Sequence, residues 1–345
     1  MMQPNAQGAL PMGRRAFLGT LWLASAAGIL TSRAPDFAAA TAQTTIRFAS
    51  LYNPDHSASR TADRFAELVG QKTAGRVKVE VFHSASLGSE REVAEGVRSG
   101  SIDMGYSGLP GFGSFAPEVH VLEMPYLYED LDEVKSVVDK LSPDLERILA
   151  AAGLRNVGYV FDGPRVTLAT RPLRSIEDFK GLKFRVPQSP LYVQMAKAFG
   201  SIPTPVALPE VYTALQTKIA EALEGSPTTL YTGKYYEVAR NLVRTDHIFH
   251  AAYIAMNPDF FKKLAPDAQK AIVDAGREST AYNLELAKKA VQEDMDRLKA
   301  ARIQVTAPDK KPFRSAVRDA NESFAQSRGQ GAVQLYRKIR EVTGR

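Results

Sequence analysis

The chain has 345 residues, with 44 Lys and Arg against 38 Asp and Glu, which gives a net charge of +6. It contains no cysteine, so disulfides, thiolate catalysis, zinc–thiolate sites and iron–sulfur clusters are excluded. Charges of both signs are interspersed without a polybasic block, so a nucleic-acid-binding surface is not expected.

The first residues have the pattern of an export signal. The pair Arg14-Arg15 precedes an uncharged apolar run from Leu18 to Leu30, and small residues follow at 38–42. This order resembles a twin-arginine signal, which a receptor reads. The alternative, an uncleaved membrane anchor, would need about 20 apolar residues, more than this run offers. We therefore expect a signal peptide over residues 1–42 and a periplasmic mature protein.

Strands and helices alternate in the next part of the chain. The pattern predicts strands at 45–50, 77–82 and 102–106, and helices at 57–71 and 90–99. Strands separated by helices of this length are typical of a mostly parallel sheet covered on both faces. The first segment is therefore predicted to be an α/β lobe.

A second series of elements follows a predicted helix at 131–152. Strands are expected at 155–161, 166–170, around Arg185 and at 220–224, with helices at 190–199 and 210–217. Asp162-Gly163-Pro164 is a turn signal between the first two of these strands. The series is predicted to form a sheet of its own, so we expect two lobes with crossings near Gly163 and His250.

Residues 259–301 are predicted to form one nearly continuous helix, weakly broken at Pro266 and Gly276. Apolar residues recur there at helical spacing. A helix of that length could run beneath both lobes.

Arg185 is the most informative residue for function. It lies in the stretch Gly181–Pro187, a short predicted strand that Pro187 ends. A guanidinium is always charged and presents a planar fork of donors, which suits two-point capture of a carboxylate. The stretch therefore favours a binder of organic anions. The alternative is an arginine that pairs with a surface carboxylate.

Several motifs in order resemble the DctP-type substrate-binding proteins of TRAP (tripartite ATP-independent periplasmic) transporters. The similarity spans residues 44–340. It rests on Gly163-Pro-Arg165, Asp178-Phe-Lys-Gly181-Leu-Lys-Phe-Arg185-Val-Pro187, Thr204-Pro-Val-Ala-Leu-Pro-Glu210-Val-Tyr212, and Leu87-Gly-Ser-Glu90-Arg-Glu92 followed by Gly100-Ser-Ile-Asp103.

The resemblance implies a two-lobed periplasmic binding protein fold, type II-like, in which each lobe is a mixed sheet flanked by helices and a long scaffold helix spans both. We place lobe I at 43–162 plus 251–290 and lobe II at 163–250 plus 291–345. The resemblance also implies that the lobes close on an organic acid and that the protein delivers this acid to a membrane permease. No cofactor and no metal are expected, and the protein is expected to be a monomer or a homodimer.

The resemblance also implies the binding residues of the second lobe. Relatives pair the arginine at the position of Arg185 with the substrate carboxylate, and Arg165 supplies a second contact. Glu224 matches a family glutamate, and we favour a role in holding an arginine, because a carboxylate beside an anionic ligand would repel it. Gly225 stands where relatives carry asparagine, so the backbone N–H of Gly225, the hydroxyl of Ser226 or Thr228, or a bulkier ligand could fill the place of the missing amide.

Three further candidates complete the predicted site. Leu208 replaces a common aromatic residue of the family. Tyr52 and Ser107 follow predicted strands of the first lobe, at the carboxyl ends where open α/β sheets place ligands. Ordinary packing is an equal alternative for Tyr52, and His56 nearby could simply cap the next helix.

Two rival functions use the same residues. An exported lyase or hydrolase could orient an acid with arginine and use Glu224 as base, and a sensor-associated binding protein would pass the bound form to a receptor. A metal site at His247 and His250 is disfavoured, since no glutamate stands beside them as in zinc proteases. The sequence predicts a carboxylate ligand but does not identify the acid.

Overall fold

The structure is a computed structural model that describes residues 43–345, so the predicted signal peptide at 1–42 lies outside the described residues. Its strands form one mixed sheet in the order β2-β1-β3-β8-β4-β7-β5-β6, and β9 pairs with β8. The bounds are β1 (Thr44–Ala49), β2 (Val77–Phe82), β3 (Met104–Ser107), β4 (Arg155–Ala169), β5 (Lys183–Val186), β6 (Ile202–Pro205), β7 (Ala222–Gly225), β8 (Asn241–Met256) and β9 (Gln304–Thr306).

Two sets of parallel strands lie on either side of two long antiparallel strands. The first lobe contains β1, β2 and β3, in which β1 pairs in parallel with both neighbours. The second lobe contains β5, β6 and β7, in which β5 pairs in parallel with both neighbours. Antiparallel β4 and β8 pair with each other, β8 with β3, and β4 with β7, so one ladder runs through both lobes. The prediction that the second series forms a sheet of its own is therefore wrong, because the β4–β8 pair joins both lobes in a single sheet. The predicted residue boundaries between the lobes stay a prediction.

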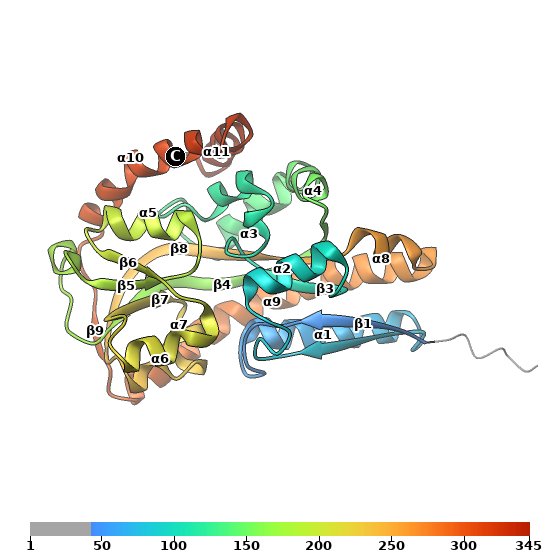
Figure 1. Ribbon diagram of the computed structural model, residues 1–345, viewed down its shortest axis with the longest axis horizontal. Helices are drawn as coiled ribbons and strands as arrows, with labels where there is room; N and C mark the ends of the chain where they lie inside the picture. The colour runs from blue at the N-terminus through green and yellow to red at the C-terminus, as the bar shows by residue number, and fades with distance from the viewer. Residues whose placement is uncertain (1–42) are drawn as a thin grey trace, which may run out of the picture. The chain divides into compact units, whose positions relative to one another are not determined.

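Helices cover this sheet (Figure 1). They are α1 (Ser57–Lys72), α2 (Glu90–Ser99), α3 (Leu131–Lys140), α4 (Ser142–Ala151), α5 (Pro190–Ala198), α6 (Val211–Gln216), α7 (Pro227–Thr232), α8 (Pro258–Lys263), α9 (Pro266–Ala300), α10 (Lys311–Ser327) and α11 (Gln330–Thr343). Short 3₁₀ helices lie between them: η1 (Phe112–Ser114), η2 (Pro117–Glu123), η3 (Ile176–Phe179), η4 (Leu208–Glu210) and η5 (Tyr235–Glu237). Within residues 43–345, no helix combines the length and apolarity needed to cross a bilayer.

The strand β4 differs from the prediction of two strands and an intervening turn. It continues from Arg155 to Ala169, with a register shift between Asp162 and Pro164. Pro164 has no N–H to donate, so the ladder absorbs the residues 162–164 as a bulge instead of ending there. The strand thereby passes from the first lobe to the second without leaving the sheet, beside His250 of β8, which is paired with Asp162.

The long helix α9 has 35 residues and touches α1, β4 and α7, elements of both lobes (Figure 1). The predicted break at Pro266 is correct, because this proline occupies the first turn of α9. The predicted break at Gly276 is wrong. A Cβ on Gly276 would lie 1.7 Å from the carbonyl oxygen of Val157, so this glycine lets the helix lie directly against β4. A proline also divides the predicted helix at 131–152, where α4 begins at Ser142 with Pro143 in its first turn.

The start of α2 is fixed by a capping box. The Ser89 side chain accepts from the N–H of Glu92, and the Glu92 carboxylate accepts from the N–H of Ser89 at 2.7 Å. The helix therefore begins at Glu90, whose carboxylate stands at the positive end of the helix dipole.

Candidate functional site

One cavity is lined by side chains from both lobes. Its walls include Tyr52 from the loop after β1, Glu90 from α2, Arg165 from β4, Arg185 from β5, Glu224 from β7 and His250 from β8. The cavity therefore lies where the two sets of parallel strands meet the β4–β8 pair.

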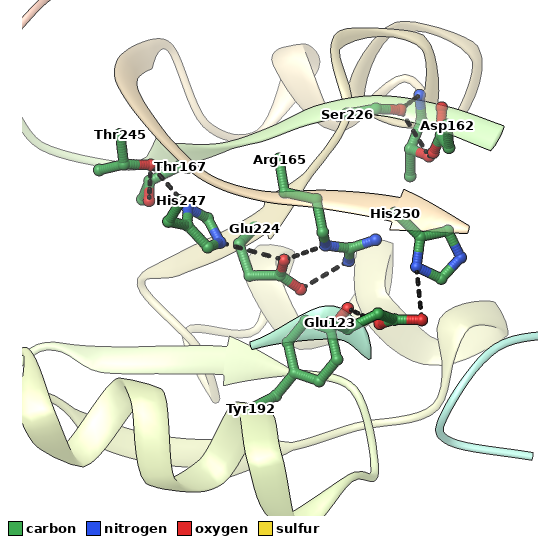
Figure 2. A network of polar contacts seen from close by, with 11 residues as sticks. Glu123, Asp162, Arg165, Thr167, Tyr192, Glu224, Ser226, Thr245, His247 and His250 are labelled. Atoms are coloured by element: carbon green, nitrogen blue, oxygen red, sulfur yellow. Dashed lines mark hydrogen bonds and ion pairs between the residues drawn. The ribbon is translucent and has the colours of Figure 1, made fainter. Parts of the chain in front are cut away.

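Arg165 and Glu224 form a buried two-point ion pair. Arg165 Nη2 donates to Glu224 Oε1 at 2.7 Å, and Arg165 Nε donates to Glu224 Oε2 (Figure 2). Burial disfavours the charged form of each side chain, but the attraction between the two opposite charges is stronger than this penalty. The pKa of Glu224 lies well below its usual range because of Arg165, and Glu224 holds the pKa of Arg165 above its usual range. Both groups are therefore charged, and Glu224 fixes one edge of the guanidinium.

A chain of polar contacts supports Glu224 from behind. His247 Nε2 lies 3.4 Å from Glu224 Oε2, and His247 Nδ1 lies 2.8 Å from Thr245 Oγ1 (Figure 2). Burial lowers the pKa of His247, so this imidazole is neutral near neutral pH. Both His247 and His250 lie in β8, and residues 43–345 contain no group of three or more His, Cys, Asp or Glu placed to hold a metal ion.

Arg185 is held by a single carbonyl group. Its Nε and Nη2 atoms donate to the carbonyl oxygen of Val206 at 3.0 and 2.7 Å. The residue is 3% exposed, and burial lowers its pKa, partly offset by Glu224. Neither Arg185 nor Arg165 uses its Nη1 atom in a hydrogen bond within residues 43–345. The protein thus holds each guanidinium through Nε and Nη2, and the N–H donors of Nη1 stay available for a ligand.

The first lobe contributes an acidic and aromatic wall. Glu90 Oε1 accepts from Ser107 Oγ at 3.4 Å and from the N–H of Gly108 at 3.3 Å, while burial raises the pKa of this carboxyl. The ring of Tyr52 stacks on His56, with centroids 3.8 Å apart. The cavity is therefore cationic on the second-lobe side and has a carboxylate on the first-lobe side.

The predicted site residues separate into two groups. The structure brings Tyr52, Arg165, Arg185, Leu208 and Glu224 together in the wall of the cavity. The other three, Ser107, Gly225 and Ser226, are not among its lining residues.

These other three residues act on the wall through their neighbours. Ser107 donates to Glu90, and Ser226 caps α7 by accepting from the N–H of Thr229 at 3.1 Å. A Cβ on Gly225 would lie 3.3 Å from Thr229 Cγ2, so this glycine lets α7 pack closely. Thr229 itself lines the cavity.

Sequence reasoning missed further residues that line the cavity, Glu90, Tyr192 and His250 among them. Glu90 and His250 line the cavity, and Tyr192 lies beneath Arg165, whose guanidinium carbon is 5.2 Å from the ring centroid. The Leu87-Gly-Ser motif before Glu90 was a usable signal. Nothing in the sequence indicated that Tyr192 of α5 would reach the Glu123 carboxylate, to which it donates at 2.6 Å.

Comparisons with known proteins agree on one family. The model of DctP, described as bacterial extracellular solute-binding protein, family 7, matches residues 48–327. The 2,3-diketo-L-gulonate-binding periplasmic protein YiaO of Escherichia coli K12 is 31% identical over 301 residues, which cover 86% of this chain and 92% of that protein. The sialic acid-binding periplasmic protein SiaP of Vibrio cholerae is 29% identical and covers 86% of this chain and 93% of its own.

Solved structures show the same fold. A TRAP periplasmic solute-binding protein of Sulfitobacter sp. NAS-14.1 with bound β-D-galacturonate superposes with a TM-score of 0.83 at 26% identity, covering 86% of this chain and 100% of that one. One from Roseobacter denitrificans with bound β-D-glucuronate has a TM-score of 0.81 at 26% identity, covering 85% and 98%.

Proposed function

The chain belongs to the DctP family of bacterial extracellular solute-binding proteins, family 7, and we propose that its cavity binds a hydroxylated monocarboxylic acid. The family captures organic acids for TRAP transporters, in which a membrane permease takes over the solute. The proposal assigns the ligand carboxylate to Arg185, with Arg165 as the second donor. The residues reach the cavity from both lobes, so a ligand between them would hold the lobes together.

The observation that supports this assignment is the state of the two arginines. Both are buried, each is fixed on one side by an acceptor of the protein, and neither uses Nη1 internally. Only Arg165 has a carboxylate of its own, so an anion is needed to complement Arg185. A hydrogen bond to a charged group contributes roughly 1.5–3 kcal/mol, and two such bonds are enough for strong selection of an anion.

The opposite wall supports the hydroxylated part of the proposal. A Glu90 carboxylate can accept hydrogen bonds from ligand hydroxyl groups, and it would repel a second ligand carboxylate. Several relatives are described with sugar acids, namely galacturonate, glucuronate and galactonate. We therefore propose sugar acids as the ligand class, ahead of dicarboxylates.

The route of export is also proposed. Relatives of this chain are periplasmic. The Arg14-Arg15 pair and the apolar run behind it support export by the twin-arginine pathway, with delivery to a permease.

A calorimetric ligand screen tests the function. The protein purified from the periplasm is titrated with galacturonate, glucuronate and galactonate, with succinate as the dicarboxylate control. We expect the sugar acids to bind and succinate to bind much more weakly or not at all. Mass spectrometry of the recovered acid separates a binding protein from an enzyme. An altered acid, or no binding by any of these ligands, would overturn the proposal.

A further inference from the structure

His250 reaches the cavity from the strand β8, at the point where β8 and β4 pass between the lobes. The residue is 8% exposed, and its Nδ1 atom lies 3.0 Å from Glu123 Oε1 (Figure 2). At Nδ1 this contact is an ion pair without hydrogen-bond geometry, and the other ring nitrogen, Nε2, makes no hydrogen bond with any residue of 43–345. One side of the imidazole thus faces a carboxylate, and the other is free for a partner.

Glu123 is well placed to keep a proton on this imidazole. It ends η2, is 1% exposed, and its Oε2 accepts from Tyr192 OH at 2.6 Å. Its second oxygen is then left for His250. A buried carboxylate beside an imidazole favours the protonated, charged form of the ring.

Charged and titratable groups face His250 from several elements. Three carboxylates face it: Glu123 of η2, Glu90 of α2 and Asp162 of β4. The guanidinium of Arg165 in β4 and the imidazole of His56, in the loop after β1, also face it. Burial alone would lower the pKa of His250, but Glu123 outweighs it and the pKa is raised.

The other two histidines of this region behave in the opposite way. Burial lowers the pKa of His56 to about 4 and also lowers that of His247, so both are neutral near neutral pH. His56 does not line the cavity, and His247 makes its contacts to Glu224 and Thr245. His250 is therefore the imidazole of the cavity wall that has a carboxylate support and a free ring nitrogen.

We propose that His250 is a third anion-binding group of the cavity and that its ring binds the ligand as the protonated imidazolium. The organic acid and a proton therefore enter the site together. This inference rests on the proposed function of the cavity as an organic-anion site. Bound anion and bound proton stabilise each other, and by linkage each increases the affinity of the other. Raising the pH removes the third positive charge and weakens binding.

Isothermal titration calorimetry across the range of histidine titration tests the inference directly. The protein is titrated with galacturonate from about pH 5.5 to about pH 8.5 at constant ionic strength, in pairs of buffers with different ionisation enthalpies. We expect net proton uptake on binding, and an affinity that falls by up to about tenfold per pH unit at the alkaline end.

Variants assign the proton to its residue. H250Q should bind more weakly at low pH and lose the proton uptake. E123Q should keep an acceptor for Tyr192 while shifting the pH dependence to lower pH. The matched control is H83Q, because His83 pairs with Asp63 at 3.1 Å and does not line the cavity. It should retain the uptake of the unmodified protein.

The outcomes separate this inference from the proposed function. Binding of galacturonate without proton uptake, or with the same uptake in H250Q, overturns the role of His250 and leaves the anion site intact. Failure of every acid to bind at every pH overturns the proposed function itself. If H250Q unfolds, NMR titration of the His250 ring in the unmodified protein decides: its pKa must rise when galacturonate is added, and an unchanged value refutes the proposal.

Discussion

Arg165 and Glu224 lie on the neighbouring strands β4 and β7, and the Nε–Nη2 edge of the guanidinium pairs with both carboxylate oxygens, with side-chain exposures of 7% and 0%. A buried pair of this kind stabilises the fold less than its geometry suggests, because both charges have lost their hydration. Its effect is to hold Arg165 in one orientation in the wall of the cavity.

Removing the charge of Glu224 should therefore lower the free energy of unfolding substantially. In E224Q the guanidinium remains buried without its counter-ion, and we expect a loss of about 3–5 kcal/mol in the free energy of unfolding. Urea denaturation measures this loss. The double variant R165M/E224M removes both charges and should recover most of the stability while losing affinity for the ligand. A double variant as unstable as E224Q would show that the ion pair itself stabilises the protein.

We expect His56 to make the stability of the protein sensitive to acid. Its Nδ1 accepts from the N–H of Ala58 at the start of α1, and its Nε2 lies 3.1 Å from Thr229 Oγ1 of the second lobe. The folded pKa of about 4 is below the ordinary value of 6.5, so the unfolded chain binds more protons between these values. The stability present above pH 6.5 should fall as the pH drops towards 4, by about 3 kcal/mol in total.

Denaturation of H56N isolates this effect. Asparagine can also cap a helix but does not titrate in this range, so H56N should lose less stability between neutral and acidic pH. Equal pH dependence in both proteins would assign the acid sensitivity to other groups.

The alternation of strands and helices up to α2 was readable from the sequence, because each element there has its own periodic pattern and cap. The run around Arg185 likewise predicted its strand, and the structure places this arginine in the wall of the cavity. The continuity of β4 was hidden, since Gly163 and Pro164 are turn residues that a bulge also accepts. The contact of His250 with Glu123 could not be predicted either, because it depends on the pairing of β8 with β4 and on the irregular segment that ends at Glu123.

Arg185 can be tested against a matched residue of its own strand. R185A should weaken binding of the acid by at least about tenfold and up to a few hundredfold, the range expected for loss of one or more charge-assisted hydrogen bonds. R185K should recover only part of this, since an ammonium group cannot both contact Val206 and present a planar fork. Calorimetry measures both affinities.

The control for Arg185 is K183A. Lys183 lies in the same strand with an exposed side chain, so its replacement also removes one positive charge but leaves the cavity unchanged. Equal losses of affinity in K183A and R185A would mean that overall charge, and not the fork of Arg185, attracts the ligand.

Gly276 decides how closely the scaffold helix approaches the sheet. Alanine is favoured over glycine in a helix by about 1 kcal/mol, so propensity alone predicts that G276A stabilises the protein. The added Cβ would instead lie 1.7 Å from the Val157 carbonyl oxygen, a backbone atom that cannot rotate away. We therefore expect G276A to lower the free energy of unfolding by at least about 2 kcal/mol, as overpacking does.

G70A in α1 is the matched control. A Cβ at this position meets nothing within 4 Å, so the substitution should stabilise the protein slightly. Thermal denaturation of the two variants should shift the melting temperature in opposite directions, and a rise in both would show that α9 does not need this glycine to lie against β4.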